Sequence, residues 1–218
     1  MTHPYTPPPH DAPFVPVYED EDIFILEKPS GLLSVPGRGD DKQDCLSERA
    51  KAQFGRVFII HRLDMETSGL MVFAKHGDAQ KNHSAIFEAR MIDKTYHALV
   101  AGHPEPERGR IELPLIRDWP NRPRQMVDHE KGKPARTDWE VRERLEGMSR
   151  VQLLPRTGRT HQLRVHMAAI GHPILGDPLY GVDTPPSPID RLCLHASRLV
   201  FRHPLNQRLI DVSSRPPF

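Results

Sequence analysis

Short runs of apolar and β-branched residues recur along this chain, and turn residues rather than long amphipathic segments separate most of them. Candidate strands cover residues 15–18, 22–27, 57–60, 69–74, 94–100, 199–201 and 208–212. A hairpin is expected within residues 137–154, with Glu146 and Gly147 at its turn. Because strands dominate without a regular alternation with helices, we predict an α+β fold with a central mixed, mostly antiparallel sheet and flanking helices.

Two segments show helical periodicity instead. One begins at Asp78 and ends before Met91, and the other follows Thr160, a suitable N-cap, and stops at Gly171. The apolar stripe of this second helix consists of Leu163, Met167 and Ile170. Arg164 lies off the stripe, so its side chain is expected on the polar side of the helix.

The first residues, MTHPYTPPPHDAP, are rich in proline and contain no apolar run, unlike a signal peptide or a membrane anchor. We expect a flexible arm over residues 1–14 and one domain of two lobes over residues 15–218. No stretch of roughly 18 apolar residues occurs, so no membrane-spanning helix is expected. Cys45 and Cys193 are far apart and lack metal-type spacing, which favours a reducing, cytoplasmic compartment.

Charge is unevenly distributed, although the net charge is only +1. Between Arg108 and Arg164 there are 14 Lys and Arg residues against 8 Asp and Glu residues. This excess permits a basic face that could contact nucleic acid. On charge alone, a solvated arginine-rich surface explains the pattern equally well.

Asp64 follows the apolar run 57–60 and precedes Thr67, Ser68 and Gly69, which places it in a loop held by the core. An aspartate in this position is, taken alone, more often a turn or capping residue. Its segment HRLDMETSG, residues 61–69, is however one of five motifs in the order of a known family. The others are KPSGLLSVPG at 28–37, KTYHALV at 94–100, RTGRTHQLRVH at 156–166 and LCLHA at 192–196. Together they resemble the RluA family of pseudouridine synthases.

The resemblance extends to the dual-specificity subfamily. We expect no N-terminal S4-type RNA-binding domain of the kind found in several relatives, and IRDWPNRPRQ at 116–125 is similar to an insertion that grips and remodels RNA. The resemblance implies the pseudouridine synthase catalytic fold with an RNA-binding cleft at Asp64. It also implies isomerisation of uridine in the tRNA anticodon stem-loop and in a hairpin of 23S rRNA, without metal or organic cofactor.

The resemblance assigns the catalytic roles. Asp64 is the catalytic carboxylate, Arg164 its ion-pair partner, and Tyr96 the tyrosine that stacks on the base and takes part in proton transfer from carbon 5. Three first steps remain open: attack of Asp64 on carbon 6 of the base, attack on carbon 1′ of the sugar, or removal of a 2′ proton to give a glycal. The family favours the glycal.

A uridine within a stem-loop has to leave the stack before a carboxylate can reach its sugar. Arg62 matches the family arginine that enters the vacated place. Arg117, Trp119, Arg122 and Arg124 are expected to contact RNA through phosphates and stacking. Taken singly, each of these residues is most often a solvated side chain or the member of a surface ion pair.

Other classes fit the sequence less well. The motif histidines His61, His161, His166 and His195 lack the spacing of a metal site, and no Gly-x-Ser-x-Gly elbow supports a hydrolase. The remaining rival is a non-catalytic RNA-binding or chaperone protein on the same scaffold. It predicts a lost carboxylate or partner, whereas Asp64, Arg62, Tyr96 and Arg164 are all present. A monomer with no membrane partner is expected.

Overall fold

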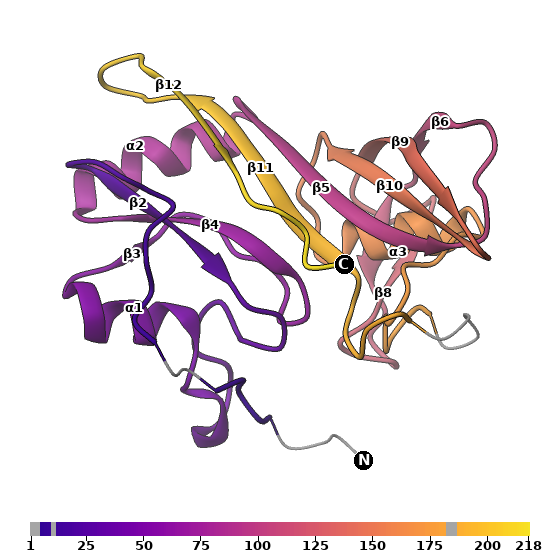
Figure 1. The fold of residues 1–218 in the computed structure, drawn as a ribbon, viewed down its shortest axis with the longest axis horizontal. Coiled ribbons are helices and arrows are strands. Elements are labelled where there is room, and N and C mark those ends of the chain that lie inside the picture. Colours follow the sequence, from indigo (N-terminus) through magenta and orange to yellow (C-terminus); the bar gives the residue numbers. More distant parts are fainter. Residues whose placement is uncertain (1–4, 10–11, 182–186) are drawn as a thin grey trace. The chain divides into compact units, whose positions relative to one another are not determined.

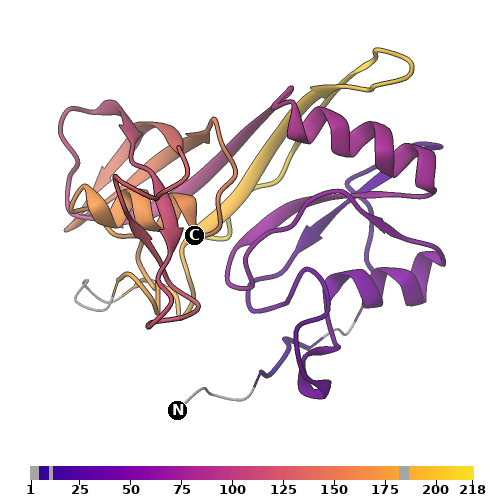
Figure 2. The same ribbon diagram turned by 180° about the vertical axis from the view of Figure 1, so that it is seen from behind.

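The chain divides into two compact units. The computed structural model describes residues 5–9, 12–181 and 187–218. Unit 1 comprises residues 1–93 and 196–215, and unit 2 comprises residues 94–195 and 216–218. The course of the chain is drawn in Figures 1 and 2. The two boundaries after residues 93 and 195 fall inside β5 (Ile92–Ala101) and β11 (Leu194–Arg202).

The described residues of unit 1 form short strands and two α-helices. Its elements are β1 (Tyr18–Glu19), β2 (Ile23–Lys28), a 3-10 turn (Asp40–Lys42), α1 (Leu46–Phe54), β3 (Phe58–Ile59), β4 (Ser68–Ala74), α2 (Gly77–Glu88), most of β11 and β12 (Leu209–Ser213). β2 pairs antiparallel with β1 and β4, β3 pairs antiparallel with β4, and β11 pairs antiparallel with β12.

Both faces of β4 are covered, which explains why all its residues are buried. Its alternate residues Leu70 and Val72 join the core that includes Ala79 of α2, whereas Met71 and Phe73 join the core that includes Leu46 of α1. Figures 1 and 2 show α1 and α2 on opposite sides of β2 and β4. The continuous apolar run therefore fits a strand without a solvent face.

Gly69 allows a close backbone approach at the start of β4. Its φ is +113°, and a Cβ atom at this position would lie 2.3 Å from the carbonyl oxygen of Ala196 in β11. Only glycine adopts this conformation without strain and leaves room for that carbonyl. The glycine of HRLDMETSG thus has a structural explanation.

In unit 2, the residues that the structure describes form an antiparallel sheet with one helix packed on it. The strands are β5, β6 (Arg108–Glu112), β7 (Leu115–Arg117), β8 (Gln125–Val127), β9 (Arg136–Leu145) and β10 (Met148–Pro155), and the helix is α3 (Gln162–Ala169). β10 pairs with β5 and β9, β9 pairs with β6, and β7 forms a separate hairpin with β8. Leu163 and Met167 of α3 belong to the same buried core as Val151 and Leu153 of β10.

The predicted α+β class is confirmed, and every pairing whose register is described is antiparallel. The helix predicted from Asp78 is α2, and the predicted hairpin is β9 and β10 with Gly147 at its turn (φ +67°). Thr160 is not the N-cap of α3. His161 occupies that position in the left-handed region, without a side-chain capping bond. The helix α1 was not predicted.

The proline-rich arm is partly described. The hydroxyl of Tyr5 donates to the carbonyl of Asp44 over 3.0 Å, and Arg49 donates to the carbonyl of Pro8 over 2.8 Å. These bonds connect residues 5–9 with the rest of unit 1. The flexibility of residues 1–14 stays a prediction.

Candidate active site

The backbone around Asp64 is held by a buried lysine. Lys28 is fully buried, and its Nζ donates hydrogen bonds to the carbonyl oxygens of Pro29 (2.8 Å), Leu32 (2.6 Å) and Met65 (2.8 Å). A buried ammonium group is stable only where such acceptors replace water. Because Met65 directly follows Asp64, Lys28 anchors the loop on its C-terminal side.

Two serines of the same segment hold the loop as well. Ser34 Oγ donates to the carbonyl of Leu63 over 2.6 Å and accepts from its N–H over 3.1 Å. Ser30 Oγ donates to the carbonyl of Glu66 over 2.6 Å. Residues 28–34 therefore bond to both sides of Asp64, whose side chain is half-buried. The arrangement fixes the backbone that carries the carboxylate, as a positioned catalytic group requires.

His61 ties the start of the loop to the rest of unit 1. Its Nε2 accepts a hydrogen bond from the N–H of Val72 over 3.0 Å, and its ring stacks on Phe87 with centroids 4.5 Å apart. Arg62, the next residue, is exposed. The loop thus presents Arg62 to solvent beside a half-buried Asp64.

In unit 2, Arg164 is buried in an ion pair with Asp177. Its Nε and Nη2 lie 2.7 and 2.6 Å from the two carboxylate oxygens, and the exposed fractions of the side chains are 3% and 0%. The expectation that Arg164 lies on a polar side of its helix is wrong, because residues 162–167 are all buried. A bidentate pair of this kind fixes the plane of the guanidinium group.

Buried polar side chains fix the start of α3. Thr157 Oγ1 donates to Gln162 Oε1 (2.6 Å), and Gln162 Nε2 donates to Thr137 Oγ1 (3.0 Å). His166 contacts Thr137 Oγ1 through Nδ1 (2.9 Å) and the carbonyl of Leu113 through Nε2 (3.0 Å). Burial lowers the pKa of His166, so its imidazole is neutral and donates from Nε2. This network connects the first turns of α3 with Leu113, Thr137 and Thr157.

Tyr96 lies in β5 opposite Leu153 of β10 and is half-buried against the core of unit 2. Thus Asp64 and Arg62 belong to unit 1, whereas Tyr96 and Arg164 belong to unit 2. The catalytic roles that the resemblance assigns to them stay predictions.

The hairpin of β7 and β8, with its loop 118–124, carries the residues other than Arg62 that are predicted to contact RNA. Trp119 is 60% exposed, and the guanidinium carbons of Arg117 and Arg122 lie 5.0 and 5.1 Å from the centre of its ring. Arg124 lies over a different ring, that of Tyr180, at 5.4 Å. Cations and an exposed aromatic face are suited to phosphates and bases. We refer to residues 115–127 as the arginine hairpin.

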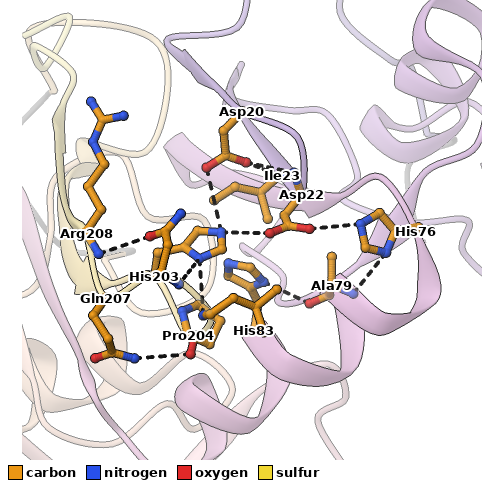
Figure 3. Close-up of polar contacts among 12 residues, drawn as sticks. Asp20, Asp22, Ile23, His76, Ala79, His83, His203, Pro204, Gln207 and Arg208 are labelled. Atoms are coloured by element: carbon orange, nitrogen blue, oxygen red, sulfur yellow. Dashed lines mark hydrogen bonds and ion pairs between the residues drawn. The ribbon is translucent and has the colours of Figure 1, made fainter.

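A further polar cluster in unit 1 lies outside the family motifs (Figure 3). His203 Nε2 is 3.1 Å from Asp22 Oδ2, and its ring lies 4.9 Å from that of His83. His83 donates from Nδ1 to the carbonyl of Ala79 over 2.8 Å. Burial lowers the pKa of His83. The cluster connects α2 with the residues that follow β11, which is a structural role.

Sequence reasoning missed three residues that shape the site, namely Lys28, Asp177 and Tyr180. Lys28 lies in the motif KPSGLLSVPG, which does not itself indicate a buried lysine, and no motif covers the segment HPILGDPLYG that carries the other two. In the part of the chain that the structure describes, no group of three or more His, Cys, Asp or Glu side chains could hold a metal ion. Among those same residues, no helix has the length and apolarity needed to cross a membrane.

Comparisons with known proteins show which family the chain resembles. Residues 22–169 match the family model described as RNA pseudouridylate synthase. The dual-specificity RNA pseudouridine synthase RluA of Pasteurella multocida (strain Pm70) is 47% identical over 216 residues, covering 98% of each chain. The enzyme of the same name from Escherichia coli (strain K12) is 47% identical over 198 residues, 90% of each chain. The solved structure of human RNA Pseudouridylate Synthase Domain Containing 1 has a TM-score of 0.78 and 30% identity, covering 98% of this chain and 87% of that one.

Proposed function

This chain belongs to the RNA pseudouridylate synthase family, and we propose that it isomerises specific uridines to pseudouridine in the tRNA anticodon stem-loop and in a hairpin of 23S rRNA. The observation that carries the proposal is 47% identity, over 98% of both chains, to a relative named as a dual-specificity enzyme. The arginine hairpin supports it, because it offers an exposed Trp119 between two arginines.

In the proposed reaction, Asp64 initiates cleavage of the N-glycosidic bond. The uracil then turns and rejoins the sugar through carbon 5, so that no atom is gained or lost. An ionised carboxylate suits this role as a nucleophile or as a base. The bonds from residues 28–34 to the neighbours of Asp64 support the role, because they limit the motion of the carboxylate.

Arg164 and Tyr96 are proposed to assist Asp64. A cation close to Asp64 would keep its carboxylate ionised in a partly dry site. The buried pair with Asp177 supports this role for Arg164, because it fixes the guanidinium group in one orientation. Tyr96 is proposed to stack on the detached base and to take part in the proton transfer from carbon 5.

Recognition of the RNA is proposed to involve both units. Arg62, which is exposed beside Asp64, would fill the place of the extruded uridine. The arginine hairpin would bind phosphates through Arg117, Arg122 and Arg124 and stack Trp119 on a base. We propose that residues 15–218 act as one catalytic domain, and that the protein is a cytoplasmic monomer.

The direct test is pseudouridine mapping on two transcripts, an anticodon stem-loop and the 23S rRNA hairpin. Matched transcripts with cytidine at the target position serve as controls. The proposal predicts conversion of both uridine transcripts by the purified protein. Conversion of one alone would overturn the dual specificity. Binding of both without conversion of either would favour the rival, a non-catalytic RNA-binding protein on the same scaffold.

A further inference from the structure

The arginine hairpin is seated on α3 by a small core of its own. Leu115 of β7 is buried together with Ala135 and with Val165 of α3, and Val127 of β8 packs against them. Tyr180, in the loop after α3, joins the same cluster. The helix that carries Arg164 therefore also supports the root of the hairpin.

The hydroxyl of Tyr180 fixes one strand of that hairpin. The backbone N–H of Gln125, at the start of β8, donates to this hydroxyl over 2.7 Å. The same oxygen lies 2.8 Å from Nδ1 of His161, the N-cap of α3, to which it can donate its own proton. Burial raises the pKa of Tyr180, which keeps the phenol protonated at neutral pH. One side chain thus links β8 to the beginning of α3.

The ring of Tyr180 lies against two arginines of different predicted roles. The guanidinium carbon of Arg124, in the hairpin, is 5.4 Å from the ring centre, and that of Arg164 is 5.2 Å away. Asp177 bonds both to Arg164 and to the backbone of the loop that carries Tyr180. Its Oδ1 accepts from Arg164 Nη2 (2.6 Å) and from the backbone N–H of Leu179 (2.9 Å) and Tyr180 (3.1 Å). One carboxylate thus orients the arginine and the loop that carries the tyrosine.

We infer that Tyr180 is a positioning residue that couples the RNA-contacting hairpin to Arg164. Its hydroxyl sets the position of β8, and its ring keeps Arg124 and Arg164 in a fixed relation. Binding of RNA by the hairpin and orientation of Arg164 then depend on one side chain. The inference rests on the proposed function, because it assigns the hairpin to RNA and Arg164 to catalysis.

Two variants separate the hydroxyl from the ring. Tyr180→Phe removes both hydrogen bonds of the hydroxyl but keeps the aromatic face. It is expected to raise KM for the stem-loop about fivefold and to leave kcat nearly unchanged, as the loss of a buried hydrogen bond implies. Tyr180→Leu also removes the ring, and it is expected to raise KM and to lower kcat about tenfold. The matched control is Tyr18→Phe, which removes the 2.7 Å bond of a phenol to Asp20 in unit 1.

A merely structural role gives a different result. It would lower the active fraction, and hence kcat, by the same factor in both variants without a change in KM. That outcome overturns the inference, as does a KM increase in Tyr18→Phe equal to that in Tyr180→Phe.

Limited proteolysis separates this inference from the proposed function. Trypsin cleavage after Arg124 is expected to be about fivefold faster in Tyr180→Phe than in wild type, because β8 loses a bond that holds it. Cleavage at this bond should be unchanged in Tyr18→Phe. Equal cleavage of Tyr180→Phe and wild type would overturn the role of Tyr180 even if both enzymes convert RNA. Faster cleavage of Tyr180→Phe, found for a protein that converts no RNA, would support the role of Tyr180 in holding β8 while refuting the proposed function.

Discussion

Replacement of Lys28 by methionine tests how much the buried lysine contributes to the loop of Asp64. Methionine keeps the length of the side chain but removes the ammonium group, which is fully buried and donates to three carbonyls over 2.6 to 2.8 Å. A hydrogen bond to a charged group contributes about 1.5–3 kcal/mol. The desolvation cost of the ammonium group is relieved in the variant and offsets part of this loss.

The expected net loss of folding free energy for Lys28→Met is about 3 kcal/mol, which counts the three hydrogen bonds at the lower limit of about 1.5 kcal/mol each and subtracts part of the desolvation cost of the ammonium group. Two of the three hydrogen bonds are only partly buried, which is why the lower limit applies. At an m-value of about 2 kcal/mol per molar urea, the unfolding midpoint falls by roughly 1.5 M. Turnover is also expected to fall under conditions where the variant stays folded, because Met65 next to Asp64 loses its anchor.

The matched control is Lys51→Met on α1. Lys51 is also a lysine near a carboxylate, Glu48, at 3.6 Å, but 63% of its side chain is exposed. Exposed ion pairs contribute less than about 1 kcal/mol. Urea denaturation of wild type and both variants provides the comparison. Equal midpoints for Lys28→Met and Lys51→Met would refute the reasoning.

Three further perturbations follow from the structure. Burial, followed by the positive charges of its neighbours, lowers the pKa of His195 to about 4. In the unfolded chain, the pKa of this histidine is about 6.5. As the pH falls from 6.5 to 4, His195 gains a proton in the unfolded state but stays neutral in the folded state, so about 3 kcal/mol of stability should be lost. Urea midpoints that do not change over this pH range would contradict this prediction. Asp177→Asn leaves Arg164 buried without its bidentate partner and should destabilise the fold by about 3–5 kcal/mol in the same assay; a loss below 1 kcal/mol would show that the pair is dispensable. Gly69→Ala should lower the melting temperature by several degrees, because the new Cβ meets a backbone carbonyl at 2.3 Å. The control Gly77→Ala should leave the melting temperature unchanged, because the space around Gly77 is open. Equal melting temperatures for the two variants would argue against the close approach at Gly69.

The strands and helices with strong local patterns could be predicted from the sequence. The apolar run of β4, the Gly147 turn between β9 and β10 and the stripe of Leu163 and Met167 in α3 each depend on neighbours in sequence. α1 was missed because its buried side chains include only Leu46, Ser47 and Ala50 among many charged residues. Such a face is too weakly apolar to predict a helix.

The site was predictable only in part. The motifs predict roles for Asp64 and Arg62, but burial of Lys28 and of Arg164 could not be predicted from them, because both residue types are usually exposed. Their burial depends on partners distant in sequence, the carbonyl of Met65 in one case and Asp177 in the other. β6 and β8 were missed for a similar reason. β6 carries two exposed arginines and β8 is only three residues long, so neither has a clear strand pattern in the sequence, whereas backbone pairing with β9 and β7 makes them strands.

The central claim is that Asp64 is the catalytic carboxylate of a pseudouridine synthase. The most direct measurement is single-turnover conversion of the anticodon stem-loop by wild type, by Asp64→Asn and by Asp78→Asn, a control at an exposed aspartate in the first turn of α2. The account predicts that Asp64→Asn binds the RNA but forms no pseudouridine, while Asp78→Asn matches wild type. Conversion by Asp64→Asn at the wild-type rate would remove Asp64 from the mechanism.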